Sequence, residues 1–535
     1  MSSYEDRQLP PLIRALLYAD AYDHPVDAIE LEETHISWVL LTGPYAYKVK
    51  KPINLGFVDF STLELRRQYC QEEIRLNRRF APGIYVEALA IEGTIESPKF
   101  VRNTTTPIEY AVKMVQFSCE DELDQLIERG ELTCDQIETF ARSIAAFHES
   151  IDVAGGHSPY GKADQVIQPV EENFKQIRQR VTDLHSLGLL EQVEDWSREQ
   201  FQLLKPIFEN READGFIREC HGDLHLANMA WVDNQPLVFD CIEFNPSLRW
   251  IDVMSEIAFL TMDLEEQGSS ELAYRFLNAY LELSGDYEGL SVLRFYLVYR
   301  LLVRAKVEAI QAYQQTKDSE EKSNAEEAFG AYLRLAVKHT QEKEPRLIIT
   351  CGLSGSGKSS VTRTLLGSLQ AIRIRSDVER KRLFGLAAEK DGGSGPVLDL
   401  YRKEATDQTY ERLATLARIG LERGFTIIVD ATCLKAEQRK RFQQLAASKR
   451  APYSILNVTA SESVLRNRLA NRQTGVSDAD AAVLEKQMSA IESFSEGEIP
   501  HIVEVNSESR IVSEKLVSAI ESSSFPTKRN HRDLL

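Results

Sequence analysis

Hydrophobic and polar residues alternate along residues 36–60, in the runs Ser37–Thr42 and Ala46–Lys50 around a turn at Gly43 and Pro44. Successive side chains of a strand point to opposite faces, so a period of two residues on both sides of a turn predicts a β-hairpin. Directly afterwards, Ser61-Thr62-Leu63-Glu64 has the sequence of a capping box. A helix is therefore predicted from about residue 62 to 79.

Phe60 and Leu65 are spaced as a hydrophobic staple at the start of that helix, and residues 110–117 are predicted to form another strand. From about 120 to 340 the pattern is mainly helical, with an interruption at 216–246 that is rich in short apolar runs and loop residues. The charged stretch Lys338–Arg346 contains Pro345 and is predicted to be a linker.

Beyond residue 345, short apolar strands alternate with helical segments, which favours a parallel α/β sheet. The predicted strands are 347–350, 372–375, 426–429 and 454–458, and the tail from Ser522 onward is expected to fray. A chain of 535 residues exceeds the size of one hydrophobic core, so at least two domains are expected.

The net charge of −19 disfavours a general nucleic-acid coat or an anionic membrane surface as a partner, although a local basic pocket stays open. No apolar run is long enough to cross a bilayer and the segment Met1–Pro10 is polar, so a cytoplasmic protein is expected. The seven cysteines form no C-x-x-C pair, which predicts reduced, mostly buried thiols.

The sequence from Gly352 to Ser359 fits the phosphate-binding pattern G-x-x-x-x-G-K-[ST], after an apolar strand and before a helix-compatible stretch at 360–369. Its glycines let backbone N–H groups turn toward a β-phosphate, and the helix N-terminus adds partial positive charge. Lys358 would reach the β and γ oxygens, and Ser359 would hold Mg²⁺. The predicted ATP-binding residues are Gly352, Ser354, Gly355, Ser356, Gly357, Lys358, Ser359 and Ser360.

With this loop and the segments around Asp377 and Asp430, residues 346–520 resemble the small P-loop kinases, including zeta-toxin-like, gluconate-kinase-like and polynucleotide-5′-kinase-like proteins. The resemblance implies that Asp377 is the catalytic base and that Arg380 anchors the substrate. A role of Asp377 as a helix N-cap alone is the alternative. Asp430, at the end of an apolar strand, is expected to orient Mg²⁺ or the acceptor.

Arg466, Arg468 and Arg472 lie in a helical stretch that resembles the lid of such kinases, where arginines neutralise charge on the transferring group. Arg468 and Arg472, four residues apart on one helix face, are the predicted catalytic pair. A solvated basic face explains Arg466 equally well.

His221-Gly222-Asp223-Leu224-His225-Leu226-Ala227-Asn228 has the H-x-D-x-x-x-x-N spacing of a kinase catalytic loop, and Asp240 ends the strand that follows. On these residues the chain resembles the aminoglycoside phosphotransferase and choline kinase family. The resemblance implies that Asp223 is the catalytic base, that Asn228 and Asp240 hold Mg²⁺, and that His221 shapes the loop. Asp252 is expected to be chiefly a helix N-cap, with a role in the substrate pocket as the alternative.

Ala46-Tyr47-Lys48 has the spacing of the ATP-binding lysine on the third strand of a kinase, with Glu73 or Glu72 of the following helix as its ion-pair partner. Lys50 lies on the same strand face as Lys48, so the assignment stays open. Residues 114–117 fall where the adenine-gripping hinge would lie. No G-x-G-x-x-G loop that would cover the phosphates precedes the strand. This absence weakens the resemblance to protein kinases more than the resemblance to small-molecule kinases.

The predicted fold is a protein-kinase-like bilobal domain, residues 1–340, followed by a parallel-sheet P-loop domain, residues 346–522, and a tail, 523–535. The lobes of the first domain are expected at about 30–118 and 119–340. The predicted cofactors are ATP and Mg²⁺, and the predicted partners are nucleotides and small hydroxyl-bearing substrates.

Three functions fit these residues. The first is a phosphotransferase with two active kinase sites. In the second, the first half is a nucleotide-sensing or substrate-presenting module for the P-loop half. In the third, the P-loop half is a kinase of nucleic-acid ends. The motifs fix the transfer and leave the acceptors and the oligomeric state open.

Overall fold

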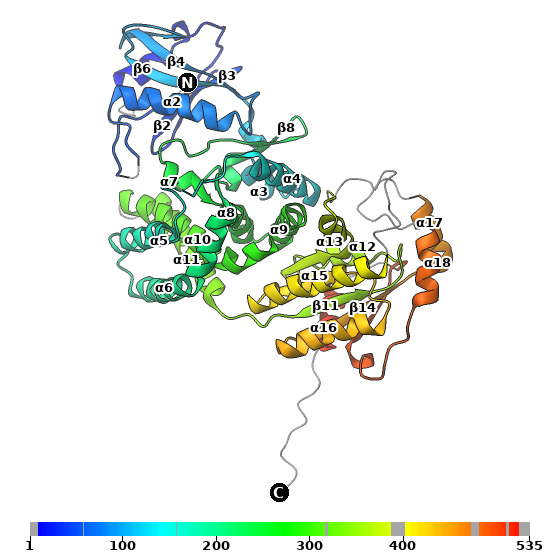
Figure 1. Ribbon diagram of the computed structural model, residues 1–535. Coiled ribbons are helices and arrows are strands. Elements are labelled where there is room, and N and C mark those ends of the chain that lie inside the picture. The colour runs from blue at the N-terminus through cyan, green and yellow to red at the C-terminus, as the bar shows by residue number, and fades with distance from the viewer. Residues whose placement is uncertain are drawn as a thin grey trace. The chain divides into compact units, whose positions relative to one another are not determined.

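The computed structural model describes residues 9–56, 58–156, 158–315, 319–386, 402–471, 481–509 and 513–523 (Figure 1). The chain divides into two compact units. Unit 1 consists of residues 1–132, 146–166 and 208–260, and unit 2 of residues 133–145, 167–207 and 261–535. Unit 2 thus groups part of the predicted first domain with the P-loop half, and the domain boundary near 340–346 stays a prediction.

Unit 1 contains a six-stranded antiparallel sheet of order β1-β2-β3-β6-β4-β5. The strands are β1 Glu30–Glu33, β2 Ser37–Leu41, β3 Tyr45–Lys50, β4 Tyr85–Thr94, β5 Ser97–Val101 and β6 Glu109–Val115. Helix α2, Leu63–Asn77, packs against β6 and β4. Helix α1, Pro11–Ala15, contributes Ile13 to a core that includes Leu40, Tyr47 and Ile91.

The predicted hairpin is formed by β2 and β3, with Thr42 N donating to Tyr45 O across the turn (2.9 Å). The predicted capping box is wrong by one residue. Thr62 is the N-cap of α2, because its side chain accepts from Leu65 N (3.2 Å), whereas the Ser61 hydroxyl donates to Asp59 (2.6 Å).

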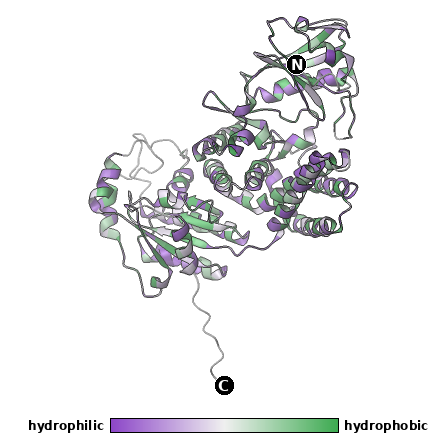
Figure 2. Cartoon of the chain, turned by 180° about the vertical axis from the view of Figure 1, so that it is seen from behind, coloured by the Kyte–Doolittle hydropathy of each residue, from purple (hydrophilic) through white to green (hydrophobic). Residues whose placement is uncertain are grey.

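The segment that interrupts the helical region forms two short strand pairs, β7 with β10 and β8 with β9. These strands are β7 Ile217–Glu219, β8 Met229–Val232, β9 Gln235–Val238 and β10 Trp250–Asp252, and helix α7 is Pro246–Arg249. The other α-helices between residues 120 and 340 are α3 Leu123–Glu128, α4 Cys134–Ser150, α5 Ala163–Arg178, α6 Leu184–Ala213, α8 Val253–Glu266, α9 Ser270–Ser284, α10 Leu290–Gln314 and α11 Glu320–Thr340. Most of them carry both hydrophobic and hydrophilic residues (Figure 2).

Unit 2 contains a parallel five-stranded sheet of order β12-β13-β11-β14-β15, which confirms the predicted fold class for the second half. Its strands are β11 Leu347–Cys351, β12 Ala371–Arg375, β13 Thr426–Asp430, β14 Tyr453–Thr459 and β15 Ile502–Asn506. Its helices are α12 Lys358–Arg363, α13 Ser376–Leu383, α15 Lys403–Glu422, α16 Ala436–Ser448, α17 Glu462–Ala470, α18 Ala481–Ala490 and α19 Ser513–Ser522.

Two predicted boundaries are wrong. Helix α12 ends at Arg363 rather than near 369, because the chain tightens there into shorter turns, such as Leu365 N to Thr362 O (3.1 Å). Helix α11 continues to Thr340, so the first residues of the predicted linker are helical.

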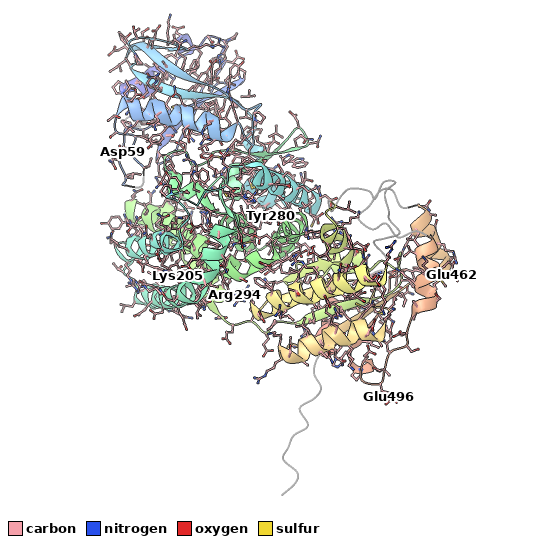
Figure 3. All side chains as sticks on the ribbon, in the orientation of Figure 1. Asp59, Lys205, Tyr280, Arg294, Glu462 and Glu496 are labelled. Atoms are coloured by element: carbon pink, nitrogen blue, oxygen red, sulfur yellow. The ribbon has the colours of Figure 1, made fainter. Side chains whose placement is uncertain are left out.

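Within unit 2, α9 packs on β12, the edge strand of the parallel sheet. The Asn278 amide bridges this edge, donating to Ala371 O (2.9 Å) and accepting from Arg373 N (2.6 Å). Nearby, Arg294 of α10 donates to Arg423 O (3.0 Å), and Tyr280 of α9 is buried (Figure 3). The side-chain amide thus replaces the neighbouring strand that β12 lacks.

Candidate active sites

The first candidate site is built on the loop from His221 to Asn228, between β7 and β8. Asn228 Nδ2 donates to the backbone oxygen of Asp223 (2.9 Å) and to its carboxylate oxygen Oδ2 (3.2 Å). His225 Nε2 lies 3.3 Å from the same oxygen. The Asp223 side chain remains 35% exposed. The predicted base is therefore held in place and is accessible.

His221 ties this loop to the strand end that carries Asp240. Its Nδ1 accepts from Asp223 N (3.3 Å), so its Nε2 is the protonated nitrogen and donates to Phe239 O (2.7 Å). Burial lowers the pKa of His221, which keeps the ring neutral. Phe239 N donates in turn to Asn228 O (3.0 Å). The structure therefore brings Asp223, Asn228 and Asp240 to one place.

Asp240 connects the loop to the N-terminal sheet. Its backbone has φ of +63°, an uncommon conformation for a residue other than glycine, and its N–H donates to the Tyr85 hydroxyl (3.0 Å). Lys48 Nζ contacts the Asp240 carboxylate and lies 3.1 Å from Glu73 Oε1. Lys48 thus links Glu73, the carboxylate on helix α2, to Asp240, the predicted metal ligand.

A second lysine forms a parallel ion pair deeper in the unit. Lys50 Nζ donates to Glu73 Oε2 (2.6 Å) and contacts Glu243, and all three side chains are buried. Burial raises the pKa of Glu73, but the charges of Lys48 and Lys50 outweigh it and lower that pKa to about 2. Only Lys48 contacts Asp240, whose side chain is 41% exposed, so Lys48 faces the accessible side of the site.

Two other predicted positions have separate partners. Glu72 takes no part in the lysine cluster and instead pairs with Arg75 and Arg249 (both 2.7 Å). Asp252 accepts from Met254 N (2.9 Å), as a cap does, and also forms a buried two-point ion pair with Arg211 (2.7 and 2.8 Å). Asp252 is 2% exposed, so it does not line an open substrate pocket. The end of β6, proposed as the hinge, leads to Phe117, which stacks edge-on against Phe239 at 5.1 Å.

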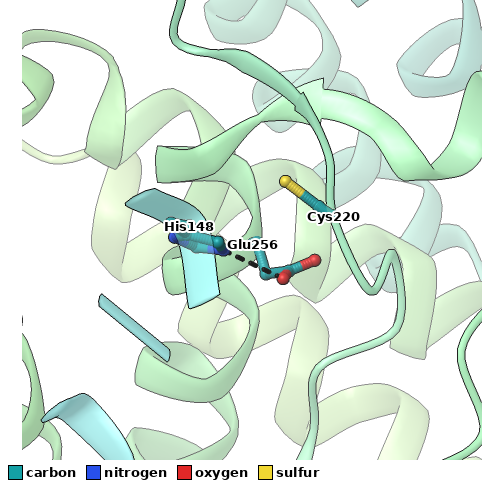
Figure 4. A group of neighbouring side chains, drawn as sticks. All are labelled: His148, Cys220 and Glu256. Atoms are coloured by element: carbon teal, nitrogen blue, oxygen red, sulfur yellow. Dashed lines mark hydrogen bonds and ion pairs between the residues drawn. The ribbon is translucent and has the colours of Figure 1, made fainter. Parts of the chain in front are cut away.

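Glu256 of α8, which Figure 4 shows beside His148 and Cys220, holds the catalytic loop and was missed by sequence reasoning. Its Oε1 accepts from His221 N (3.1 Å) and its Oε2 from Gly222 N (2.7 Å). His148 Nε2 lies 3.1 Å from Oε1. The available signal was a single carboxylate within the apolar run Val253–Leu260, since such a buried charge requires partners.

Cys220 lies beside Glu256 and His148, and this trio has the spacing of metal ligands. However, both oxygens of Glu256 already accept backbone N–H groups. Burial also raises the pKa of Cys220 well above its usual value, which favours the thiol over the metal-binding thiolate. We therefore assign the trio to positioning Asp223 rather than to a metal.

Glu256→Gln should lower the free energy of unfolding by about 3 kcal/mol at neutral pH, because one amide oxygen cannot serve both N–H groups and His148. Burial raises the pKa of Glu256, but the hydrogen bond and charge of His148 and the Gly222 N–H lower it to about 2. A lowered folded-state pKa stabilises the fold above the ordinary value of 4.5 and loses that contribution as the pH falls from 4.5 toward 2. The difference between variant and wild type should shrink over that range.

Thermal unfolding of the full chain, followed between pH 7 and pH 2.5, measures this difference. Glu96→Gln, which removes an exposed carboxylate from unit 1, is the matched control and should behave as wild type. A gap between Glu256→Gln and wild type that does not change with pH would contradict the lowered pKa of the Glu256 carboxyl group.

The second candidate site is the loop between β11 and α12, in unit 2. Gly352, Gly355 and Gly357 have φ of +148°, +82° and +90°. A side chain at Gly352 would collide with the Val458 carbonyl, so this position requires glycine. Lys358 Nζ donates to the carbonyls of Gly352 (3.0 Å) and Leu353 (2.8 Å) and thus lies across the loop.

The other loop residues offer polar atoms. Ser354 N donates to Gln487 Oε1 (2.8 Å), and the buried Ser356 Oγ has no hydrogen-bond partner among the described residues. Ser359 and Ser360 are exposed at the start of α12. Asp430 Oδ2 lies 3.4 Å from Thr362 Oγ1, one turn after Ser359. An orphaned buried hydroxyl and a nearby carboxylate suit a loop that binds phosphate and a divalent cation.

Asp377 and Asp430 lie at the carboxyl edge of the sheet, where ligands of parallel sheets bind. Burial lowers the pKa of Lys358, and the carboxylates of Asp430 and Asp377 oppose that effect. Asp377 lies 3.5 Å from Arg380 Nη1. The alternative that Asp377 is the N-cap of α13 is wrong, because Arg375 holds that position and Asp377 lies in the first helical turn.

The predicted lid arginines differ in their contacts. Arg468 Nη1 donates to Gly355 O (3.2 Å) and to Ser507 Oγ (2.8 Å), which holds α17 against the phosphate-binding loop. Arg466 pairs at the surface with Glu462 (2.7 Å) and also contacts Glu485, as the solvated-face alternative predicts. Arg472, predicted as the second catalytic arginine, lies outside the described residues.

Comparison with known proteins supports both halves of this description. Residues 119–296 match the family model described as "Phosphotransferase enzyme family", and residues 347–494 match the family model described as "AAA domain". The matches confirm the predicted combination of an aminoglycoside-phosphotransferase-like and a P-loop kinase-like segment. The chain is therefore a phosphotransferase.

An uncharacterised protein of Mycobacterium tuberculosis is 29% identical over 467 residues, which cover 86% of this chain and 90% of that protein. Among solved structures, a choline/ethanolamine kinase family protein from Mesorhizobium loti is 10% identical. The aligned region covers 61% of this chain and 97% of the Mesorhizobium loti chain, with a TM-score of 0.37. A gluconokinase from Sinorhizobium meliloti is 23% identical, and the aligned region covers 34% of this chain and 91% of the gluconokinase chain, with a TM-score of 0.23.

None of the described helices combines the length and the apolar character needed to cross a lipid bilayer. All seven cysteines are free, and five of them are buried.

Proposed function

We propose that this protein is an ATP- and Mg²⁺-dependent phosphotransferase with two kinase sites, each of which transfers the γ-phosphoryl group to a hydroxyl of a small molecule. The observation that carries the proposal is the convergence of side chains in unit 1. Lys48 joins Glu73 to Asp240, while His221 and Asn228 join the Asp240 strand to Asp223.

In each site a carboxylate would accept the proton of the attacking hydroxyl as the new oxygen–phosphorus bond forms. The bond between the γ-phosphorus and the bridging oxygen then breaks, and ADP leaves. Asp223 serves this role in the first site, and Asp377 in the second. Lys48, which is buried, and Lys358, which is half-buried, would pair with phosphate oxygens, and their partial removal from water strengthens that attraction.

The oxygen donors present fit a Mg²⁺ ion in each site. Asn228 Nδ2 is engaged by Asp223, which leaves its carbonyl oxygen for a cation beside Asp240. In the second site the donors would be Ser359 and Asp430. The metal would supply neutralisation of the phosphate charge as it is transferred.

The alternative that the first half only senses nucleotide is disfavoured, because Asp223 is accessible and held by the side chains of Asn228 and His225. A nucleic-acid-end kinase remains an alternative for the second half, and it would need an open basic groove rather than an enclosed pocket. We further propose that the protein acts in the cytoplasm.

The function is tested with γ-labelled ATP and a panel of hydroxyl compounds, comparing wild type with a variant carrying both Asp223→Asn and Lys358→Ala. The double variant and chelated wild type should both lose transfer to background. Asp233→Asn with Lys440→Ala, which changes two exposed residues, is the control and should keep full activity. Transfer that persists in a folded double variant would defeat the proposal.

A further inference from the structure

A cavity of about 300 Å³ within unit 2 is lined by five arginines. They lie on α4, α9, α12 and β12: Arg142, Arg275, Arg363, Arg373 and Arg375. Only two carboxylates, those of Glu138 and Glu282, line the same cavity. The wall therefore has an excess of positive charge, although the whole chain is strongly acidic.

The cavity adjoins the candidate reaction centre of the P-loop site. Ser359 and Ser360, which follow Lys358 directly, form part of its wall. Arg375 and Val378, which flank Asp377 along the chain, form another part. The carboxylates of Asp377 and Asp430 act on the charges of both Lys358 and Arg375, so the cavity and the loop share one electrostatic environment.

The carboxylates in the wall are shared between arginines. Glu138 pairs with Arg275 (2.5 Å) and with Arg363 (2.9 Å). Glu282 pairs with Arg373 (2.8 Å) and with Arg375 (3.4 Å). Two carboxylates that do not line the cavity also take part, since Asp135 pairs with Arg363 (3.0 Å) and Glu271 pairs with Arg275 (3.7 Å). Each guanidinium group has five N–H donors, and one carboxylate shared between two such groups cannot accept from all of them. Each arginine therefore keeps N–H donors that the carboxylate does not satisfy.

Two arginines have capacity for a further acceptor. Arg142 donates to the Thr139 hydroxyl (2.7 Å) and pairs with no carboxylate in the part of the chain that the structure describes. Arg373 is 8% exposed, and its Nε is buried with no hydrogen-bond partner among the described residues. An unmet donor of a buried charged group is costly, so it indicates a ligand that accepts hydrogen bonds.

We propose that this cavity binds the acceptor of the P-loop site, and that the acceptor is a small hydroxyl compound carrying a carboxylate or phosphate group. The inference rests on the proposed phosphotransfer at Lys358 and Asp377. The volume corresponds to roughly ten water molecules, which suits a monosaccharide-sized compound rather than a polymer. Part of the wall comes from α4 and α9, so segments of the chain far before residue 346 complete the site.

The test uses the full chain with the first site silenced by Asp223→Asn, γ-labelled ATP, Mg²⁺ and matched pairs of acceptors. D-gluconate is compared with D-sorbitol, and D-glucose 6-phosphate with D-glucose, so that each pair differs in its anionic group. At least one anionic member should be preferred over its neutral partner by about tenfold or more in kcat/KM.

Arg142→Gln should raise the KM for the preferred anion about tenfold with kcat little changed, and should leave neutral acceptors unaffected. Glu138→Gln should act in the opposite direction and lower that KM, because it releases Arg275 and Arg363. Arg334→Gln, which removes an exposed arginine of α11 outside the cavity, should change neither value.

The inference is overturned if no anionic acceptor is preferred, or if neither Arg142→Gln nor Glu138→Gln changes its KM. The proposed function would still stand in that case, provided that Lys358→Ala abolishes the remaining transfer. If transfer in the Asp223→Asn background survives Lys358→Ala, the phosphotransfer proposed for the P-loop fails instead.

Discussion

Asp223→Asn should lower kcat at the first site by about 10²- to 10⁴-fold, while ATP binding and the second site remain unchanged. Asparagine has nearly the same shape as aspartate, so Asn228 and His225 can keep their places. It cannot take the proton of the acceptor hydroxyl, and the loss should therefore fall on the chemical step rather than on the fold.

The measurement is phosphate transfer in a Lys358→Ala background, so that only the first site reports. Asp233→Asn is the matched control, because Asp233 lies at an exposed turn between β8 and β9 with φ of +50°, which asparagine also tolerates. A folded Asp223→Asn variant with normal kcat would show that Asp223 is not the base and would favour the sensing module.

Lys358→Ala should lower kcat/KM at the second site by about 10²- to 10³-fold. Its side chain is half-buried, and its ammonium donates to the loop carbonyls of Gly352 and Leu353. A phosphate would replace those carbonyls as the acceptor. Alanine removes the positive charge that offsets the developing negative charge on the transferring group, and no other lysine lies in this loop.

This loss is measured in an Asp223→Asn background, where only the P-loop site reports. Lys440→Ala, an exposed lysine of α16, controls for the loss of a lysine in the same unit. Because burial lowers the pKa of Lys358, its removal should not destabilise unit 2. An unchanged rate in the variant would mean that the loop has no catalytic role.

The sequence predicted those parts of the molecule whose signals are local. The phosphate-binding loop and the H-x-D-x-x-x-x-N loop have fixed spacings, and the strands at 347–350 and 426–429 are short apolar runs before loop residues. Each is specified by neighbouring residues, so no knowledge of distant contacts was needed. Strand β15, Ile502–Asn506, also alternates apolar and polar residues, but no motif drew attention to it.

Other features depend on contacts between distant residues. A period of two residues places Lys48 and Lys50 on one face, and only the positions of Asp240 and Glu243 distinguish them. Glu256 reaches the catalytic loop from a helix more than thirty residues later in the chain. The arginine cavity combines residues from 138 to 378, and no spacing rule connects them.

The amide of Asn278 has a consequence for dividing this chain. The strand before Asp377 is the outermost of the parallel sheet, and its backbone is completed by a residue almost a hundred positions earlier. A piece cut at the apparent boundary near residue 346 would present that unprotected backbone to other molecules, and such edges promote self-association. The second half is therefore better studied in the full chain, with the first site inactivated by mutation, than as a separate fragment.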